Sequence, residues 1–190
     1  MDGQASHHLV ETAIEALARM THRGGIASDG KTGDGCGLLM KKPEAFFREA
    51  AQDLGAELSK NFGVGMVFLS KDADKAQHAK NVLSQEITKQ DLEVAIWRSV
   101  PVDSSVCGEI GLATLPDFEQ VLINCPDDMD AFELERKLFL ARRSAEKLLA
   151  DDKDFYVPSL SGLVIVYKGL VIPEDLPKFY LDLADQRLAS

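Results

Sequence analysis

The chain has 190 residues, of which 45% are hydrophobic and 27% are charged, and its formal net charge is −10. This length and composition are typical of a globular domain with a sizeable core, and no apolar run approaches the ~18 residues of a membrane span. The acidic balance, with no run of Lys or Arg, argues against nucleic acid or an anionic membrane as a partner.

The first elements are predicted to be a helix, a loop and a strand. Apolar side chains recur at helical spacing over residues 8–21, and Ser6 fits the N-cap position. The helix is expected to end at the glycine pair that follows, because glycine favours non-helical dihedrals. Residues 26–35, rich in Gly, Asp, Ser and Thr, are predicted to be a loop, and residues 37–42 a short strand.

Helices and strands continue to alternate, unevenly, along the rest of the chain. The predicted helices cover residues 43–55, 73–90, 127–152 and a short stretch near 174–183, and the predicted strands cover residues 62–70, 92–102, 118–126, 154–160 and 162–172. In the first of these strands, Gly63 and Gly65 predict close packing of another backbone. No repeat, low-complexity tract or linker is visible, so residues 1–190 are predicted to be part of a single domain of mixed α and β.

The segment between the first helix and the first strand contains a phosphate-loop pattern, formed by Gly25, Gly30, Lys31 and Thr32. A true phosphate loop follows a strand and opens a helix, whose N-terminal NH groups and dipole hold the anion. Here a helix precedes the loop and a strand follows it. We therefore expect no ATP site at this loop.

Two interpretations of the glycine-rich loop remain open from the residues alone. The loop is either a helix-to-strand connection that needs positive φ at several glycines, or a place where bare backbone approaches a ligand. In the second interpretation Arg23 is directed at a carboxylate, because its planar guanidinium binds carboxylates through two parallel hydrogen bonds.

The cysteines, Cys36, Cys107 and Cys125, are few and far apart. An odd count, wide spacing, the absence of a CxxC pair and the lack of a visible secretory signal predict reduced, packed thiols in a cytoplasmic protein. The four histidines do not space with the cysteines as zinc ligands do, so no metal site is predicted.

The sequence resembles a known family in three segments. "ALARMTHRGGIASDGKTGDGCGLLMKKPEAFFRE" (residues 16–49) is similar to the N-terminal glutamine amidotransferase domain of the glutamate synthase large subunit, in which a helix ends in His-Arg-Gly and leads to a Thr-Gly-Asp-Gly-x-Gly loop. "GVGMVFL" (63–69) and "FYVPSLSGLVIVYKGLV" (155–171) are similar to later segments of that domain. The resemblance covers essentially the whole chain, and the middle, about residues 75–125, is the least diagnostic part.

The resemblance implies an α+β fold of the N-terminal-nucleophile hydrolase type, a four-layer αββα sandwich, here incomplete at both ends. It implies hydrolysis of L-glutamine to glutamate and ammonia by an N-terminal cysteine whose own α-amine is the general base. Arg23 matches the family's residue at the glutamine pocket, and Gly24, Thr32 and Asp34 are expected to bind substrate beside it.

For the parent enzyme, the resemblance also implies FMN and an iron–sulfur cluster, both outside this chain, and reductive transfer of the ammonia to 2-oxoglutarate. The implied partners are the remaining domains of the same polypeptide and a reductase subunit or ferredoxin. Three scattered cysteines do not supply an iron–sulfur cluster's usual ligand set, so no cofactor is expected in this chain itself.

The departures from the family pattern concern the two ends. The chain opens with Met1 rather than Cys-Gly, and the family's Arg-Phe-Ser-Thr and His-Asn-Gly segments are absent. The nucleophilic cysteine is therefore expected upstream of Met1, no catalytic residue is assigned within the chain, and the chain as given is predicted to be inactive. Two hypotheses follow: a fragment of the glutaminase domain of glutamate synthase, or a non-catalytic binding or regulatory module of the same fold.

Overall fold

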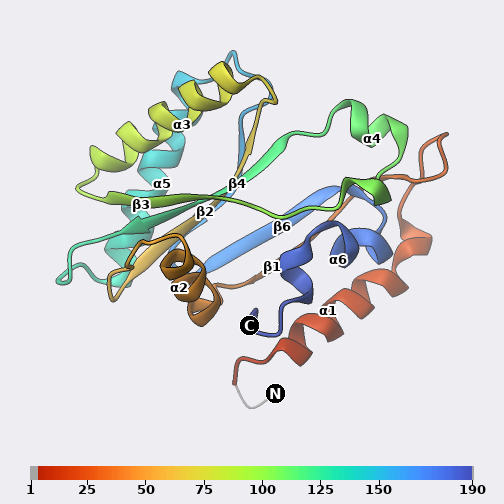
Figure 1. The fold of residues 1–190 in the computed structure, drawn as a ribbon, viewed down its shortest axis with the longest axis horizontal. Helices are drawn as coiled ribbons and strands as arrows, with labels where there is room; N and C mark the ends of the chain where they lie inside the picture. The colour runs from red at the N-terminus through yellow and green to blue at the C-terminus, as the bar shows by residue number, and fades with distance from the viewer. Residues whose placement is uncertain (1–3, 190) are drawn as a thin grey trace. The chain divides into compact units, whose positions relative to one another are not determined.

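The computed structural model describes residues 4–189 (Figure 1). Contacts divide the chain into two compact units, between which the chain passes after residues 46, 99, 115 and 165. Unit 1 consists of Met1–Phe46, Val100–Leu115 and Val166–Ser190, and unit 2 consists of Phe47–Ser99 and Pro116–Ile165. Because the segments interleave, the sequence contains no linker that would reveal the division. A single domain over residues 1–190 stays a prediction.

Unit 2 is built on a four-stranded antiparallel sheet (Figure 1). Its strands, in the spatial order β3-β4-β2-β5, are β3 (Glu93–Ser99), β4 (Asp117–Asn124), β2 (Phe62–Leu69) and β5 (Tyr156–Ser161). The inner strand β2 is almost entirely buried, and Val64 pairs with Leu122 on one side and with Ser161 on the other. A strand that is buried on both faces reads as a continuous apolar run, as the sequence "FGVGMVFL" does.

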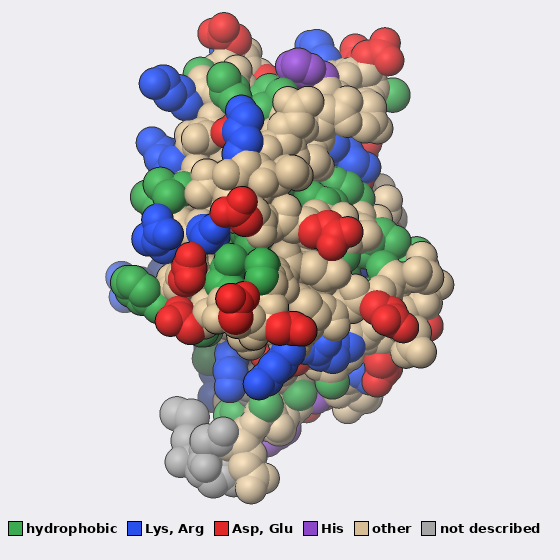
Figure 2. Space-filling model, turned by 90° about the vertical axis from the view of Figure 1, so that its left-hand side faces the viewer, with side chains coloured by type: hydrophobic (Ala, Val, Ile, Leu, Met, Phe, Trp, Pro, Cys, Tyr) green, Lys and Arg blue, Asp and Glu red, His purple; other side chains and the backbone are tan. Residues whose placement is uncertain are grey.

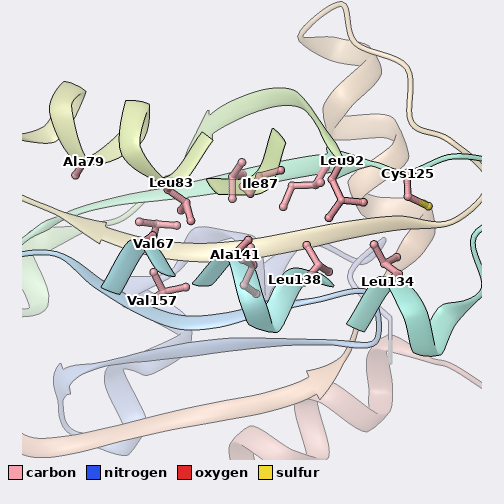
Figure 3. Close-up of a cluster of buried hydrophobic side chains, with 14 of the residues drawn as sticks. Val67, Ala79, Leu83, Ile87, Leu92, Cys125, Leu134, Leu138, Ala141 and Val157 are labelled. Atoms are coloured by element: carbon pink, nitrogen blue, oxygen red, sulfur yellow. The ribbon is translucent and has the colours of Figure 1, made fainter. Parts of the chain in front are cut away.

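Helices α3 (Ala73–Thr88) and α5 (Ala131–Leu148) pack against each other and against this sheet. Each begins at an aspartate N-cap: Asp72 accepts from the backbone N–H of Asp74 and Lys75, and Asp130 accepts from that of Glu133. The core between helices and sheet is aliphatic (Figure 3), and its members include Val67, Leu83, Ile87, Val121, Leu134, Leu138, Ala141 and Val157. Helix α2 (Glu44–Asp53) lies between β1 and β2 in the chain.

The prediction that another backbone packs on Gly63 and Gly65 was wrong: packing there is close, but side chains make it. A Cβ at Gly63 would lie 2.8 Å from the side chain of Leu138, and one at Gly65 would lie 2.6 Å from that of Leu160. Large side chains from α5 and β5 therefore fill the space that the glycines leave. A glycine in a strand indicates close packing, but it does not indicate whether a backbone or a side chain fills the space.

Unit 1 contains α1 (His7–Arg19) and a two-stranded sheet of β1 (Thr32–Lys41) and β6 (Val164–Val171), of which β6 enters the unit at Val166. As predicted, Ser6 is the N-cap of α1, and its hydroxyl accepts from the backbone N–H of Leu9. The remaining elements are short turns of helix: η1 (Thr21–Arg23), η2 (Ser104–Val106), α4 (Glu109–Ala113), η3 (Pro173–Asp175), α6 (Leu176–Phe179) and η4 (Leu181–Ala184). None of the helices within residues 4–189 is long and apolar enough to span a membrane.

Strand β1 begins at Thr32, so the predicted loop over residues 26–35 is too long and the predicted strand over 37–42 too short. The cause is the close approach of β6. A Cβ at Gly33 would lie 2.5 Å from the carbonyl oxygen of Val171, and one at Gly37 would lie 2.7 Å from Cβ of Lys168. These glycines are strand residues that let a second backbone pass, a tertiary reason that composition does not reveal.

Candidate functional site

The candidate site is built within unit 1, where α1 gives way to the glycine-rich segment. One turn of 3-10 helix ends at Arg23, whose backbone N–H donates to the Met20 carbonyl at 2.8 Å. The Arg23 side chain is exposed, and its guanidinium makes no hydrogen bond or ion pair with any residue in the described part of the chain. The site therefore presents a cation that is available to a ligand.

The segment that follows is a tight hairpin rather than an open loop. Ile26 and Gly33 form an antiparallel bridge, the Asp34 N–H donates to the Gly25 carbonyl at 3.1 Å, and the Ala27 N–H donates to the Thr32 carbonyl at 2.8 Å. A helix precedes this segment and a strand follows it, as predicted, whereas a phosphate loop follows a strand and opens a helix.

The hairpin places the carboxylate of Asp34 over bare backbone. A Cβ built on Gly24 would lie 3.4 Å from Oδ1 of Asp34, and one built on Gly25 would lie 3.4 Å from Oδ2. Asp34 itself is exposed. The hairpin thus brings two of the predicted substrate-binding positions together, Asp34 and Gly24, and Gly24 directly follows a third, Arg23, in the chain.

Glycine occurs in this segment for three different physical reasons. Gly30 and Gly35 have positive φ, +70° and +113°, as the interpretation as a plain connection requires. Close contact with β6 accounts for the two strand glycines described above. Gly24 and Gly25 have neither reason: Gly24 is extended, with φ −95° and ψ 151°, and Gly25 has no positive φ. Their lack of side chains leaves the Asp34 carboxylate uncovered.

Thr32, the fourth predicted substrate-binding residue, lies inside the structure. It is only 4% exposed. Its hydroxyl donates to Oδ2 of Asp29 at 2.5 Å, and the hydroxyl oxygen, Oγ1 of Thr32, accepts from the Gly111 N–H at 3.0 Å. Both hydrogen-bonding capacities of the hydroxyl are therefore used within the protein. This arrangement makes Thr32 a residue that positions the hairpin.

Asp29 is the centre of this arrangement, which we call the Asp29 hub (Asp29, Thr32, Gly108, Ile110 and Gly111). Oδ1 of Asp29 accepts from the N–H groups of Lys31 and Thr32, at 3.0 and 2.8 Å, and Oδ2 accepts from the Ile110 N–H at 3.0 Å. The hydrogen bonds from Thr32, followed by those from Lys31 and Ile110, hold the pKa of Asp29 well below its usual range. The hub fastens the hairpin to the start of α4.

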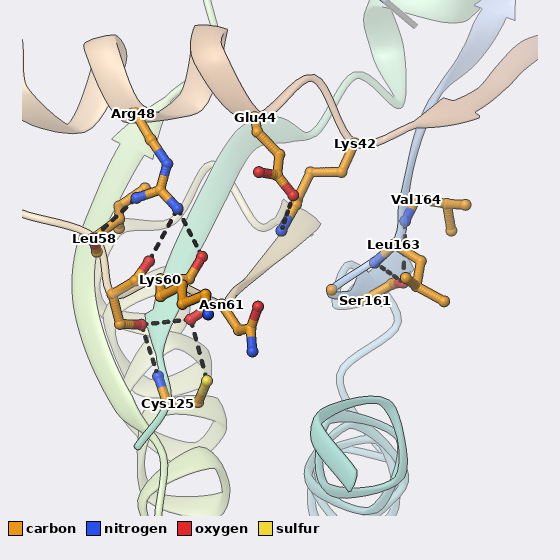
Figure 4. Close-up of polar contacts among 12 residues, drawn as sticks. Lys42, Glu44, Arg48, Leu58, Lys60, Asn61, Cys125, Ser161, Leu163 and Val164 are labelled. Atoms are coloured by element: carbon orange, nitrogen blue, oxygen red, sulfur yellow. Dashed lines mark hydrogen bonds and ion pairs between the residues drawn. The ribbon is translucent and has the colours of Figure 1, made fainter. Parts of the chain in front are cut away.

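None of the three cysteines has the character of a nucleophile. Burial, with the nearby carboxylates of Asp34 and Asp175, raises the pKa of Cys36 to about 11, and its thiol donates to the Val171 carbonyl at 3.3 Å. Burial also raises the pKa of Cys107. The Cys125 thiol is buried and donates to the Asn61 carbonyl at 3.1 Å, in a network where Arg48 donates to the carbonyls of residues 58–60 (Figure 4).

Sequence reasoning missed the residues that hold the site in place. Asp29 could have been found, because an aspartate three residues before Thr32 is a common way to close a turn. Gly108 and Ile110 carry no local signal, since they meet the hairpin only through the tertiary fold. In residues 4–189, no group of three or more His, Cys, Asp or Glu side chains is arranged to hold a metal ion.

Comparisons with known proteins place the chain in a family. The sequence model of the family "Glutamine amidotransferases class-II" matches residues 1–190. The chain is 37% identical to the glutamate synthase [NADPH] large chain of Bacillus subtilis over 192 residues, which are 100% of this chain and 13% of that protein. It is 39% identical to the ferredoxin-dependent glutamate synthase 2 of Synechocystis over 190 residues, 99% of this chain and 12% of that protein.

A plant relative agrees with the bacterial ones: the chloroplastic ferredoxin-dependent glutamate synthase 2 of Arabidopsis thaliana is 38% identical over 195 residues, 100% of this chain and 12% of that protein. The chain thus spans about an eighth of the length of these relatives. The predicted fold class, an α+β fold of the N-terminal-nucleophile hydrolase type, is that of the matched family, and the helices and antiparallel sheets described above agree with it. The chain belongs to the class-II glutamine amidotransferases.

Proposed function

We propose that this chain is part of the glutaminase domain of an enzyme of the glutamate synthase type. In this proposal the domain hydrolyses L-glutamine to glutamate and ammonia, and the ammonia is transferred reductively to 2-oxoglutarate elsewhere in the polypeptide. The observation that carries it is the Asp34 carboxylate lying over the bare backbone of Gly24, the residue that follows Arg23, in a chain whose whole length matches the amidotransferase family.

The chemistry of these groups suits an amino acid. A zwitterion offers one carboxylate and one ammonium group, and the hairpin offers one guanidinium and one carboxylate, neither engaged in a hydrogen bond between side chains of the described residues. Arg23 would bind the substrate carboxylate through two parallel hydrogen bonds, and Asp34 would accept from the ammonium. Thr32 would serve the site by keeping the hairpin in place.

The nucleophile is assigned to a cysteine that precedes residue 1, as the family resemblance implies. Cys36 and Cys107 are protonated at neutral pH because their pKa values are raised, and no cysteine within the chain has its own free α-amine as base. The described residues contribute substrate binding and orientation to the reaction.

The cofactors and partners of the parent enzyme are proposed to lie outside these residues. An iron–sulfur cluster does not fit here, because three scattered cysteines do not supply the usual four ligands and the thiols of Cys36 and Cys125 donate to backbone carbonyls. FMN and the cluster are assigned to the remaining polypeptide. The names of the relatives include both NADPH and ferredoxin, so the electron donor, a reductase subunit or ferredoxin, is left open. A cytoplasmic location is proposed from the cysteine content of the sequence, an odd number of cysteines at wide spacing.

The test compares Arg23→Ala and Arg23→Lys with wild type in the full-length protein that the gene encodes. Loss of a charge-assisted hydrogen-bonded pair is worth ~1.5–3 kcal/mol, so we expect kcat/KM for glutamine to fall about 10- to 150-fold in the alanine variant. Lysine should restore little, because it lacks the planar fork. Glutamate formation from added ammonium is the control, since it bypasses glutamine hydrolysis and should be unchanged.

Equal glutamine kinetics in wild type and Arg23→Ala would refute the role of Arg23. Binding of glutamine without hydrolysis by the full-length wild type would favour the alternative, a binding or regulatory module of the same fold.

A further inference from the structure

Helix α5 has one face that the fold of unit 2 does not use. Its inner face, with Leu134, Leu138 and Ala141, points into the core (Figure 3). On the opposite side, exposed residues recur at helical spacing. We call them the outer face of α5: Phe132, Arg136, Phe139, Leu140, Arg143 and Lys147.

The three apolar side chains of the outer face, Phe132, Phe139 and Leu140, are all exposed to solvent. Phe132 is 81% exposed, Phe139 is 59% exposed and Leu140 is 39% exposed. Single exposed hydrophobic residues are normal, but apolar side chains gathered on one helix face and interspersed with polar groups are typical of interaction surfaces.

Helix α3 shows that the position in the fold does not impose such a face. It packs beside α5 on the same sheet. Yet its exposed residues in the middle and last turns are polar: Gln77, His78, Asn81, Gln85 and Thr88. The apolar outer face belongs to α5 alone of the two helices, so a property of this surface beyond folding accounts for it.

The charges of the outer face all have one sign. Arg136, Arg143 and Lys147 are cationic, and no carboxylate is among the six residues. Glu133 and Glu146, which pair with the two arginines, flank the face. The chain as a whole has a net charge of −10. Figure 2 shows carboxylates spread among basic and hydrophobic side chains over the face that it presents.

We propose that the outer face of α5 is a docking surface for an acidic, partly apolar segment of the same polypeptide, outside residues 1–190. A surface of two phenylalanines, one leucine and three cations is complementary to carboxylates interspersed with apolar side chains. The net charge disfavours nucleic acid and anionic membranes, and at long range also a separate acidic protein. A tethered segment avoids that barrier, because its effective concentration is set by the connection.

The amount of polypeptide available for this role follows from the relatives, of which the chain spans only 12–13%. The inference therefore rests on the proposed function to this extent: it requires a long parent polypeptide. It does not require glutamine hydrolysis.

The experiment places the photoreactive residue p-benzoylphenylalanine at Phe139 of the full-length protein, with Asn81 on α3 as the matched control position. After irradiation, cross-linked peptides are mapped by mass spectrometry in a mixture of isotopically light and heavy protein. We expect a cross-link from position 139, at least 10-fold above that from position 81, to a segment outside residues 1–190 of the same copy that contains Asp or Glu and apolar residues. Phe132→Ser with Arg143→Ser should abolish it.

Three results would overturn the proposal: no cross-link above the control, a cross-link to another copy, or one within residues 1–190. Each is read independently of activity. A cross-linked protein without glutaminase activity would sink the proposed function alone, and an active protein without the cross-link would sink this inference alone.

Discussion

At the scale of single residues, Asp29 and its neighbours decide where the site groups lie. Gly108 lies so close to the hub that a Cβ there would be 2.3 Å from Oδ2 of Asp29 and 2.5 Å from Oγ1 of Thr32. The hub is therefore a junction where an added methyl group cannot be accommodated without breaking hydrogen bonds. Gly24, by contrast, would place its Cβ no closer than 3.4 Å to any neighbour.

Gly108→Ala should destabilise the hub by about 1–3 kcal/mol, because overpacking forces the hydrogen-bonded groups apart. Gly24→Ala, the control, should change stability by no more than about 0.5 kcal/mol. Amide hydrogen exchange at Ile110 and Gly111, whose N–H groups donate to the hub, measures both. Equal protection in the two variants would contradict the tight packing described here.

Asp29→Asn tests the charge of the hub through its pH dependence. The folded-state pKa of Asp29 is lowered from an ordinary value of 3.8, so the carboxylate stabilises the fold fully above 3.8 and loses this contribution as pH falls through the folded pKa. The melting temperature of the wild type should therefore lie above that of the variant at pH 7. The difference between the two melting temperatures should begin to shrink only below about pH 4. A difference that is already lost at pH 5 would show that another group is responsible.

The thiols give a third prediction at this scale. Cys36, Cys107 and Cys125 should react slowly with a maleimide at pH 7 in the native protein and fast after denaturation. The reason is that thiolates react, whereas these thiols are buried or half-buried and two have raised pKa values, about 11 for Cys36. Mass spectrometry of labelled peptides gives the rate for each residue. Rapid native labelling of Cys36 would contradict its packed environment.

At the scale of elements, α5 has a buried face that stabilises unit 2 and an exposed face that does not, and neighbouring residues lie on opposite faces. Leu138 is fully buried in the core, and Phe139, the next residue, is 59% exposed. The two faces of this helix therefore answer to different constraints, the core of unit 2 on one side and solvent or a partner on the other.

Leu138→Ala should lower the free energy of unfolding of unit 2 by about 2–5 kcal/mol, since it removes buried methyl groups and leaves a cavity next to Gly63. Phe139→Ala should change it by no more than about 0.5 kcal/mol. Hydrogen exchange of the β2 amides reports both values. A larger loss for Phe139→Ala than for Leu138→Ala would show that the helix is rotated from the orientation described.

The elements also show what the sequence could and could not predict. Helical spacing of apolar residues indicated α1 and α5, and a continuous apolar run bounded by polar residues indicated β2, which is buried on both faces. Composition failed at the start of β1, where Gly33 indicates a loop locally but is a strand residue that lies against β6. At the site, family motifs selected Arg23, Gly24 and Asp34, whereas the role of Thr32 depends on α4, which was not predicted.

At the scale of the whole molecule, the chain passes between its two units after residues 46, 99, 115 and 165. Each unit has buried aromatic or aliphatic side chains of its own: Tyr167 and Tyr180 in unit 1, and Leu83 and Leu122 in unit 2. Local periodicity contains no information on this interleaving, which arises from long-range contacts.

This interleaving limits how the gene segment can be recombined. Unit 1 needs three separate stretches of chain and unit 2 needs two. A crossover between two homologous genes at any point from codon 47 to codon 165 would join parts from different ancestors within at least one unit. Chimaeras should therefore tolerate exchange of residues 1–190 as a whole far better than exchange of any part of this range. Libraries made by recombining homologous genes should yield folded proteins mainly with breakpoints near the two ends of this range.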